Sequence, residues 1–183
     1  MNHTPHQKGP WQVVGSTPKY ENHWISVRED QVIRPDGKTG IFGVVTMRPG
    51  ISVLPVDDDG YVYLMQEYKY GTEKETIEVI SGSGEPGEAL HDTVRREMEE
   101  EAGLIAREIT DLGYIDPFTS VVNSPNYLYL AEGLIEGMPE PEGTEHIQVL
   151  RVPYQQALDW VMDGTITHGA SVAIILKVRD YLV

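Results

Sequence analysis

The sequence predicts an α/β (α+β) protein in which a strand-rich first half is followed by a strongly acidic helix and two C-terminal helices. Three observations support this class. Six candidate strands separated by turn signals fill the region up to residue 80, apolar residues recur at helical spacing after residue 89, and two further helical patterns follow residue 153. The 183 residues correspond to about one domain, because single domains commonly contain roughly 100–200 residues.

The candidate strands are runs of apolar and β-branched residues bounded by turn-forming residues. Two of the turns, Pro35–Gly37 and Asp57–Gly60, have hairpin-like sequences. The six predicted strands span about Trp11–Gly15, His23–Ile33, Thr39–Met47, Ile51–Val56, Tyr61–Tyr68 and Thr76–Ile80.

A helix is predicted at about Ala89–Ala102. Leu90, Val94 and Met98 lie four residues apart and form one apolar stripe. Gly103 follows, at a position where helices commonly end in a left-handed residue.

Two more helices are predicted near the C-terminus, one beginning at Pro153 and one spanning about Ser171–Leu182. We expect them to pack on the sheet rather than to carry chemistry. Their inward-facing apolar residues are Ala157, Trp160 and Val161 in the first helix, and Ile174, Ile175, Val178 and Leu182 in the second.

Composition excludes several classes of function. The 29 acidic residues exceed the 14 basic ones and give a net charge of −15, which disfavours binding to the phosphate backbone of nucleic acids. No apolar run approaches the ~20 residues of a membrane span, and the N-terminus lacks a signal-peptide core. The absence of cysteine excludes disulfides and thiolate zinc sites, and the six histidines show no metal-ligand spacing. We therefore expect a cytoplasmic protein with no nucleic-acid or membrane partner.

The acidic residues concentrate on the predicted helix at 89–102. Glu97 lies three residues before Glu100 and four before Glu101, so the three carboxylates occupy neighbouring positions on one surface. A solvated acidic face is the usual explanation of such a run. A hard cation such as Mg²⁺, which prefers carboxylate oxygens, is the alternative. The spacing alone leaves both explanations open.

The wider pattern favours the cation. From Gly82 the sequence reads Gly, five residues, Glu88, seven residues, Arg96-Glu97-Met98, one residue, Glu100-Glu101, one residue, Gly103-Leu104. This pattern resembles the complete Nudix box, with every fixed position filled. The resemblance implies a Nudix fold, in which a mixed β-sheet lies between helices and a loop–helix–loop binds a divalent metal. It also implies an enzyme that hydrolyses a nucleoside diphosphate linked to another moiety.

The resemblance assigns roles to particular residues of the box. It implies that Mg²⁺ or Mn²⁺ is bound by the carboxylates of Glu97, Glu100 and Glu101 and by the backbone carbonyl of Ser81. Arg96 would orient the glutamates and Glu88 would support them, while Gly82 and Gly103 would serve backbone geometry. In a later loop Glu142 and Glu145 are both candidates for the catalytic base, and Glu100 is a further catalytic candidate.

About 45 residues precede the first core strand, and this leader is similar to that of the ADP-ribose pyrophosphatase group. The similarity implies that residues 1–47 form an antiparallel sheet that builds a homodimer and lends residues to the partner's substrate pocket, and that residues 48–183 form the Nudix hydrolase domain. It further implies substrate-binding roles for Lys69, Arg34, Trp24 and Pro117. Lys69 stands where the group has an arginine. Pro117 lacks the Ser-Pro-Gly context typical of that loop, and Ser124-Pro125-Asn126 is a second candidate for it.

Three aromatic residues of the leader have two open explanations. Trp11, Tyr20 and Trp24 could stack on an adenine base, but aromatic residues in strands more often belong to a core or a dimer interface.

The predicted function is Mg²⁺-dependent hydrolysis of the pyrophosphate bond of a nucleoside diphosphate sugar, with ADP-ribose, cleaved to AMP and ribose 5-phosphate, as the favoured substrate. Another nucleoside diphosphate derivative, such as GDP-mannose or a dinucleotide coenzyme, is the alternative among enzymes. A Nudix-fold sensor that binds a nucleotide sugar without cleaving it is the alternative outside enzymes, and the intact box argues against it.

Overall fold

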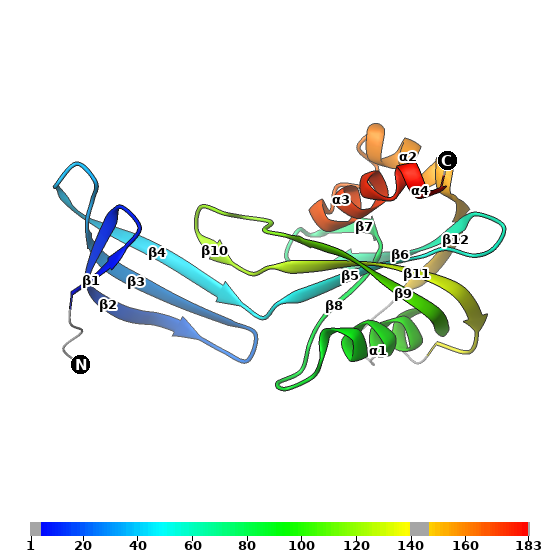
Figure 1. Ribbon diagram of the computed structural model, residues 1–183, viewed down its shortest axis with the longest axis horizontal. Helices are drawn as coiled ribbons and strands as arrows, with labels where there is room; N and C mark the ends of the chain where they lie inside the picture. Colours follow the sequence, from blue (N-terminus) through cyan, green and yellow to red (C-terminus); the bar gives the residue numbers. More distant parts are fainter. Residues whose placement is uncertain (1–4, 140–146, 183) are drawn as a thin grey trace. The chain divides into compact units, whose positions relative to one another are not determined.

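The computed structural model describes residues 5–139 and 147–182 (Figure 1). The chain forms two compact units. The first contains the residues up to Arg48 together with Asp116–Ser124, and the second contains Pro49–Ile115 and Pro125–Val183.

The first unit is a five-stranded sheet in the order β1-β2-β3-β4-β10. Strands β1 to β4 pair antiparallel, as predicted for the N-terminal sheet, and β10 adds a short parallel partner to β4. The strands are β1 (His6–Lys8), β2 (Trp11–Glu21), β3 (Ile25–Ile33), β4 (Thr39–Met47) and β10 (Val122–Asn123).

One strand boundary in this sheet was predicted wrongly. β2 continues past Gly15 to Glu21 and pairs with β3 along that length. The register shifts between Val13 and Gly15 and again between Pro18 and Tyr20. These two irregularities let glycine and proline, which otherwise weaken strands, lie within a continuous strand.

The second unit contains a four-stranded mixed sheet in the order β8-β5-β11-β9 and a three-stranded sheet in the order β12-β6-β7. β5 and β11 pair parallel and the other pairs are antiparallel, so the predicted mixed sheet is confirmed. The strands are β5 (Gly50–Pro55), β6 (Tyr61–Lys69), β7 (Lys74–Glu78), β8 (Ile80–Ser83), β9 (Leu104–Ile115), β11 (Asn126–Glu136) and β12 (Gln148–Pro153).

Helices cover both faces of this unit. Figure 1 shows α1 on one side of the strands and α2, α3 and α4 on the other. The second C-terminal helix, predicted as one element, is divided at Val178 into α3 and α4. The helices are α1 (Leu90–Ala102), α2 (Tyr154–Met162), α3 (Gly169–Lys177) and α4 (Arg179–Leu182). Among the described residues, no helix is long and apolar enough to cross a membrane.

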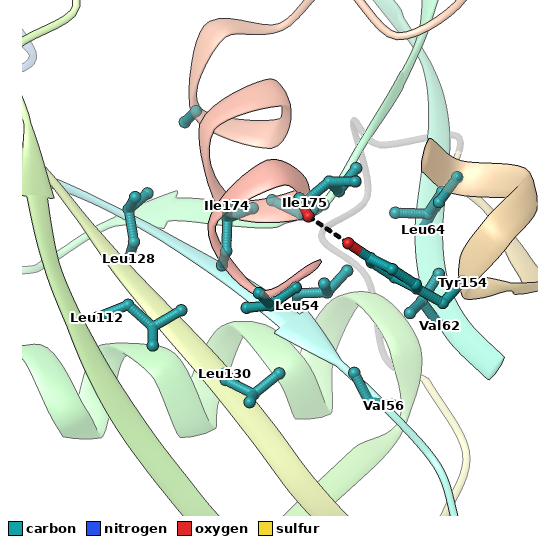
Figure 2. Close-up of a cluster of buried hydrophobic side chains, with 14 of the residues drawn as sticks. Leu54, Val56, Val62, Leu64, Leu112, Leu128, Leu130, Tyr154, Ile174 and Ile175 are labelled. Atoms are coloured by element: carbon teal, nitrogen blue, oxygen red, sulfur yellow. Dashed lines mark hydrogen bonds between the residues drawn. The ribbon is translucent and has the colours of Figure 1, made fainter. Parts of the chain in front are cut away.

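Each face of the strands in the second unit has its own apolar cluster. Leu54, Leu128 and Ile174 are fully buried in the cluster beneath α2 and α3. There the Tyr154 hydroxyl donates a hydrogen bond of 2.7 Å to the Ile175 carbonyl and so joins α2 to α3 (Figure 2). Met98 belongs to the second cluster, beneath α1.

Candidate active site

The acidic helix α1 is defined by local signals at both ends. Before it, the Glu85 amide donates to the Glu88 carboxylate at 2.9 Å, and the Glu88 amide donates to the Glu85 carbonyl at 3.0 Å, which closes a tight loop. After it, Gly103 adopts the left-handed conformation with φ of 64°, and its amide bonds the Glu99 carbonyl. The helix therefore begins and ends within one residue of its predicted bounds.

Arg96 links three carboxylates at the surface of α1. Its Nε lies 3.0 Å from Glu88 Oε1, its Nη1 lies 2.9 Å from Glu100 Oε2, and its Nη2 lies 3.0 Å from Glu97 Oε1. The hydrogen bond from Arg96, together with the Glu85 amide, lowers the pKa of Glu88 to about 2. One guanidinium thus offsets part of the repulsion among these like charges and fixes their orientation.

Gly82 lies against the Glu97 carboxylate. A Cβ at residue 82 would stand 2.0 Å from Glu97 Oε1 and 2.1 Å from Glu97 Cδ, so no side chain fits there without moving the carboxylate. Ser81, the preceding residue on β8, pairs with Ser52 of β5. The loop backbone and the Glu97 side chain are therefore in close contact.

Glu101 is the most buried of the acidic residues on α1, with 9% of its surface exposed. It lies in the electrostatic field of Lys69 from β6. Among the described residues, no three carboxylate or imidazole groups are already gathered as a metal would hold them. The donor set is nevertheless suited to a hard cation, since it offers carboxylate oxygens and, at Gly82, a backbone that closely approaches one of them.

Lys69 lies on β6 and forms an ion pair with Glu67 of the same strand. Burial alone would lower the pKa of Lys69, but the hydrogen bond to Glu67 and the charges of Glu78 and Glu101 raise it above its usual range. Lys69 is therefore a cation held among carboxylates on the side of the strands that faces α1.

The other predicted substrate-binding residues belong to the first unit. Trp24 is 65% exposed beside the β2–β3 turn, and Pro117 is exposed in the 116–124 loop. Arg34 is half exposed and pairs with Asp36 at 3.2 Å. The candidate bases Glu142 and Glu145 lie outside the described residues.

Two hollows accompany these residues. A surface depression of about 460 Å³ in the second unit is lined by Arg96, Glu99, Glu100 and Met138. An apolar cavity of about 310 Å³ in the first unit is lined in part by Trp11, which packs edge-on against Phe42 with ring centroids 5.5 Å apart. Of the three leader aromatics, Tyr20 and Trp24 are exposed and Trp11 is partly buried.

Sequence reasoning did not single out Glu78 and His168, which lie close enough to Lys69 to interact with its charge. Glu78 is 8% exposed, and its Oε2 lies 3.3 Å from Nδ1 of His168. The sequence contained a signal for Glu78. Residues two apart on a strand share a face, and this spacing relates Glu67 to Lys69 on β6 and Thr76 to Glu78 on β7.

Comparison with protein families identifies both parts of the chain. The NUDIX domain model matches residues 46–169, and the model described as nucleoside diphosphate sugar hydrolase N-terminal domain matches residues 11–45. The chain belongs to the Nudix family. It is a Nudix hydrolase, as predicted, and enzymes of this family generally use a divalent metal.

Individual relatives and a solved structure agree with this assignment. The chain is 27% identical to the ADP compounds hydrolase NudE of Escherichia coli over 75% of this chain and 73% of the relative, and 27% identical to an ADP-ribose pyrophosphatase of Bacillus subtilis over 75% of each. An ADP-ribose pyrophosphatase of Mycobacterium tuberculosis is 27% identical over 92% of this chain and 83% of its own length. A crystal structure of an ADP compounds hydrolase superposes with a TM-score of 0.80 at 22% identity, covering 100% of this chain and 96% of the other, which confirms the Nudix fold.

Proposed function

We propose that the protein hydrolyses the pyrophosphate bond of a nucleoside diphosphate sugar with the help of Mg²⁺ or Mn²⁺, and that ADP-ribose is the favoured substrate, giving AMP and ribose 5-phosphate. The observation that carries the proposal is the intact box geometry, in which Arg96 orients Glu88, Glu97 and Glu100 while Gly82 leaves room for the Glu97 carboxylate. The names of the relatives, ADP-ribose pyrophosphatase and ADP compounds hydrolase, support the substrate class.

In this proposal Glu97, Glu100 and Glu101 hold the cation together with the carbonyl of Ser81. A bound divalent cation would neutralise phosphate oxygens and lower the pKa of a coordinated water. The surrounding residues supply orientation. Arg96 keeps Glu97 and Glu100 pointed to one side of α1, and the left-handed turn at Gly103 ends the helix directly after Glu101.

Substrate contacts are proposed for both units. Lys69 would attract the diphosphate, since it is a cation on the side of the strands that faces α1. Arg34 and Trp24, in residues 1–47, and Pro117, in the 116–124 loop, would also contact the substrate. In this proposal the protein is a cytoplasmic homodimer with two active sites. Glu142, Glu145 and Glu100 are the proposed candidates for the catalytic base, which must come within hydrogen-bond reach of the attacking water.

The test is a turnover assay with purified protein, ADP-ribose and Mg²⁺, in which the released phosphomonoesters are measured. A parallel panel of GDP-mannose, a dinucleotide coenzyme and a nucleoside triphosphate ranks the substrates by kcat/KM. We expect ADP-ribose to rank first and chelation of the metal to stop the reaction. Absence of turnover with every nucleoside diphosphate compound, accompanied by binding of a nucleotide sugar in calorimetry, would replace the proposal with the sensor function.

A further inference from the structure

One face of the sheet in the first unit combines apolar and charged side chains. Asp30 of β3 lies opposite Ser16 of β2 and Phe42 of β4 in the antiparallel register. Val32, two residues further along β3, lies opposite Val13 of β2. Residues paired in this way, and residues two apart on one strand, point to the same side of a sheet. These five side chains therefore share one face.

The apolar cavity of about 310 Å³ lies on this face, and a segment from a distant part of the chain forms one of its walls. The Val45 amide of β4 donates to the Val121 carbonyl at 2.9 Å, and β10 pairs with β4 directly afterwards. Residues 119–123 line the cavity and are thus held to the sheet by backbone hydrogen bonds. The volume is at the lower end of the range for preformed small-molecule sites.

A second hollow on the same face, of about 390 Å³, has a different character. Its lining includes three residues with basic side chains, His6, Lys8 and Arg28, in a chain whose net charge is −15. Lys8 and Asp30 line both this cationic hollow and the apolar cavity. The two spaces are therefore adjacent, and a single molecule could occupy both.

Asp30 is a buried charge at the boundary of the two spaces, with 4% of its surface exposed. The Ser16 hydroxyl donates to Asp30 Oδ1 at 2.6 Å, and Arg28 Nε lies 3.2 Å from Oδ1 and 3.3 Å from Oδ2. Burial opposes ionisation of Asp30, but the bond from Ser16 and the charge of Arg28 outweigh it and lower the pKa of this carboxyl. Because each carboxylate oxygen can accept two hydrogen bonds, Oδ2 can accept another from a ligand.

The order of these groups is complementary to a nucleoside 5′-monophosphate. A flat base packs well against aromatic rings, which Trp11 and Phe42 supply in the apolar cavity. A carboxylate such as Asp30 can accept hydrogen bonds from ribose hydroxyls. Lysine and arginine, here Lys8 and Arg28, pair with phosphate. An alkyl carboxylate would match the apolar and cationic parts but has no hydroxyl to donate to Asp30.

We propose that the apolar cavity and the cationic hollow together form a binding site for a nucleoside 5′-monophosphate, made of other residues than those of the metal-binding box. Among the described residues, the lining of the two hollows includes none of the substrate-contact candidates Arg34, Trp24 and Pro117. The hydrolysis proposed above would release AMP, so a reaction product is the expected occupant. Binding at this site does not itself require turnover.

Calorimetry with AMP tests the site in the presence of EDTA, so that no metal occupies the box. We expect AMP to bind about tenfold or more tightly than adenosine or inorganic phosphate, each of which reaches only part of the site. The 2′,3′-dideoxy analogue of AMP, which lacks the donors for Asp30, should also bind about tenfold more weakly than AMP. This ligand series uses the wild-type protein and so does not depend on how a variant folds.

An NMR titration locates the bound AMP. The indole N–H resonance of Trp11, assigned by its loss in Trp11→Phe, should shift on addition of AMP, while those of Trp24 and Trp160 should not. Adding α,β-methylene ADP-ribose with Mg²⁺ should leave the Trp11 resonance in its AMP-bound position, because the analogue is expected at the box.

A lysine substitution tests the cationic hollow. Lys8→Ala should weaken AMP binding about tenfold and leave adenosine binding unchanged, since only the phosphate has lost a partner. Lys19→Ala is the matched control. Lys19 is on the same sheet, but it pairs at 3.0 Å with Glu29, which alternates with Asp30 along β3 and so points to the opposite face.

The proposal is overturned if AMP produces neither heat nor a Trp11 shift, if Lys8→Ala binds AMP as tightly as wild type, or if the dideoxy analogue binds as well as AMP. It is also overturned if the ADP-ribose analogue displaces AMP, because the two hollows would then belong to the substrate site. A Trp11 resonance that shifts with protein concentration alone would assign the hollows to a second copy of the chain. Failure of the protein to hydrolyse ADP-ribose would overturn the proposed function and leave these binding results unaffected.

Discussion

The two faces of the strands in the second unit differ in the kind of side chain that packs on them. The face beneath α2 and α3 is an apolar cluster in which residues such as Leu54 and Ile174 are fully buried. The face beneath α1 begins as an apolar cluster around Met98 and then gives way to Glu101, Lys69 and Glu78, which are charged and partly or wholly buried. One face is thus specialised for stability and the other for ionic chemistry.

This separation has an energetic reason. Like charges placed together on α1 repel each other and would destabilise an isolated helix. The apolar cluster on the opposite face supplies burial free energy that is independent of those charges. Changes on one face should therefore alter activity, and changes on the other should alter stability.

The largest effect is expected at Glu101 on the charged face. Glu101→Gln removes a proposed metal ligand without changing its shape, so kcat should fall about 100- to 1,000-fold in the ADP-ribose assay. Glu101 also attracts Lys69, so urea denaturation of the metal-free variant is measured alongside and should show a folded protein under the assay conditions. Glu99→Gln, an exposed neighbour on the same helix, should keep its activity. Full turnover by Glu101→Gln would remove the reason for assigning the chemistry to this face.

On the apolar face, a substitution should have an effect of comparable free energy, but on stability and not on activity. Ile174→Ala leaves a cavity beneath α3 and should lower the free energy of unfolding by about 2–5 kcal/mol in urea denaturation. KM and kcat measured well below its melting temperature should stay near wild type. Leu176→Ala, on the same helix but 40% exposed, should cost far less. A large loss of kcat in fully folded Ile174→Ala would show that the two faces are not separable.

Gly82 tests the contact between loop and helix. Gly82→Ala places a methyl group against the Glu97 carboxylate and should destabilise the protein by about 1–3 kcal/mol while also reducing kcat. Gly71→Ala is the matched control, since a Cβ at residue 71 meets no atom within 4 Å. Chemical denaturation and turnover assays on both variants test this prediction. Equal unfolding free energies and equal kcat values for the two variants would contradict a close contact between Gly82 and Glu97.

The smallest effect concerns the pH dependence of stability. The pKa of Glu88 is lowered to about 2 in the folded protein, so its pairing with Arg96 stabilises the protein above the ordinary glutamate range near 4.5 and is lost as the pH falls toward 2. Glu88→Gln should therefore lower the free energy of unfolding at pH 7 by about 1 kcal/mol, and the difference from wild type should vanish near pH 2. Urea denaturation at several pH values measures this. A difference that persists at pH 2 would point to a cause other than charge.

Local signals made part of this architecture predictable. The bounds of α1 follow from the spacing of Leu90, Val94 and Met98 and from Gly103, and β4 has the bounds that were predicted. The strands β1, β9, β10, β11 and β12 were not predicted, although β11 is central to the mixed sheet. The single strand predicted at Thr76–Ile80 is divided between β7 and β8, which belong to different sheets. Residues Leu128 to Ala131 of β11 are all buried, so they form a continuous apolar run without the alternation that identifies a strand.

Some contacts at the site could not be predicted from the sequence, because they join residues that are far apart in the chain. The carboxylates of the box are contiguous on one helix, so their grouping was evident from spacing alone. His168 showed no metal-ligand spacing and no motif, and its contact with Glu78 forms only because α3 begins beside β7. A contact between two residues 90 positions apart has no local pattern to reveal it.

The parallel pairing of β5 with β11 has a consequence for how the chain acquires its structure. Gly50 is matched with Asn126, 76 positions later, and the whole acidic helix lies between them. Loop-closure entropy opposes such distant pairing, and domains rich in it fold in milliseconds to seconds rather than microseconds. During synthesis on the ribosome, β5 must wait for β11 to emerge, with its apolar residues exposed in the meantime. A truncated chain ending before residue 126 should therefore aggregate instead of folding.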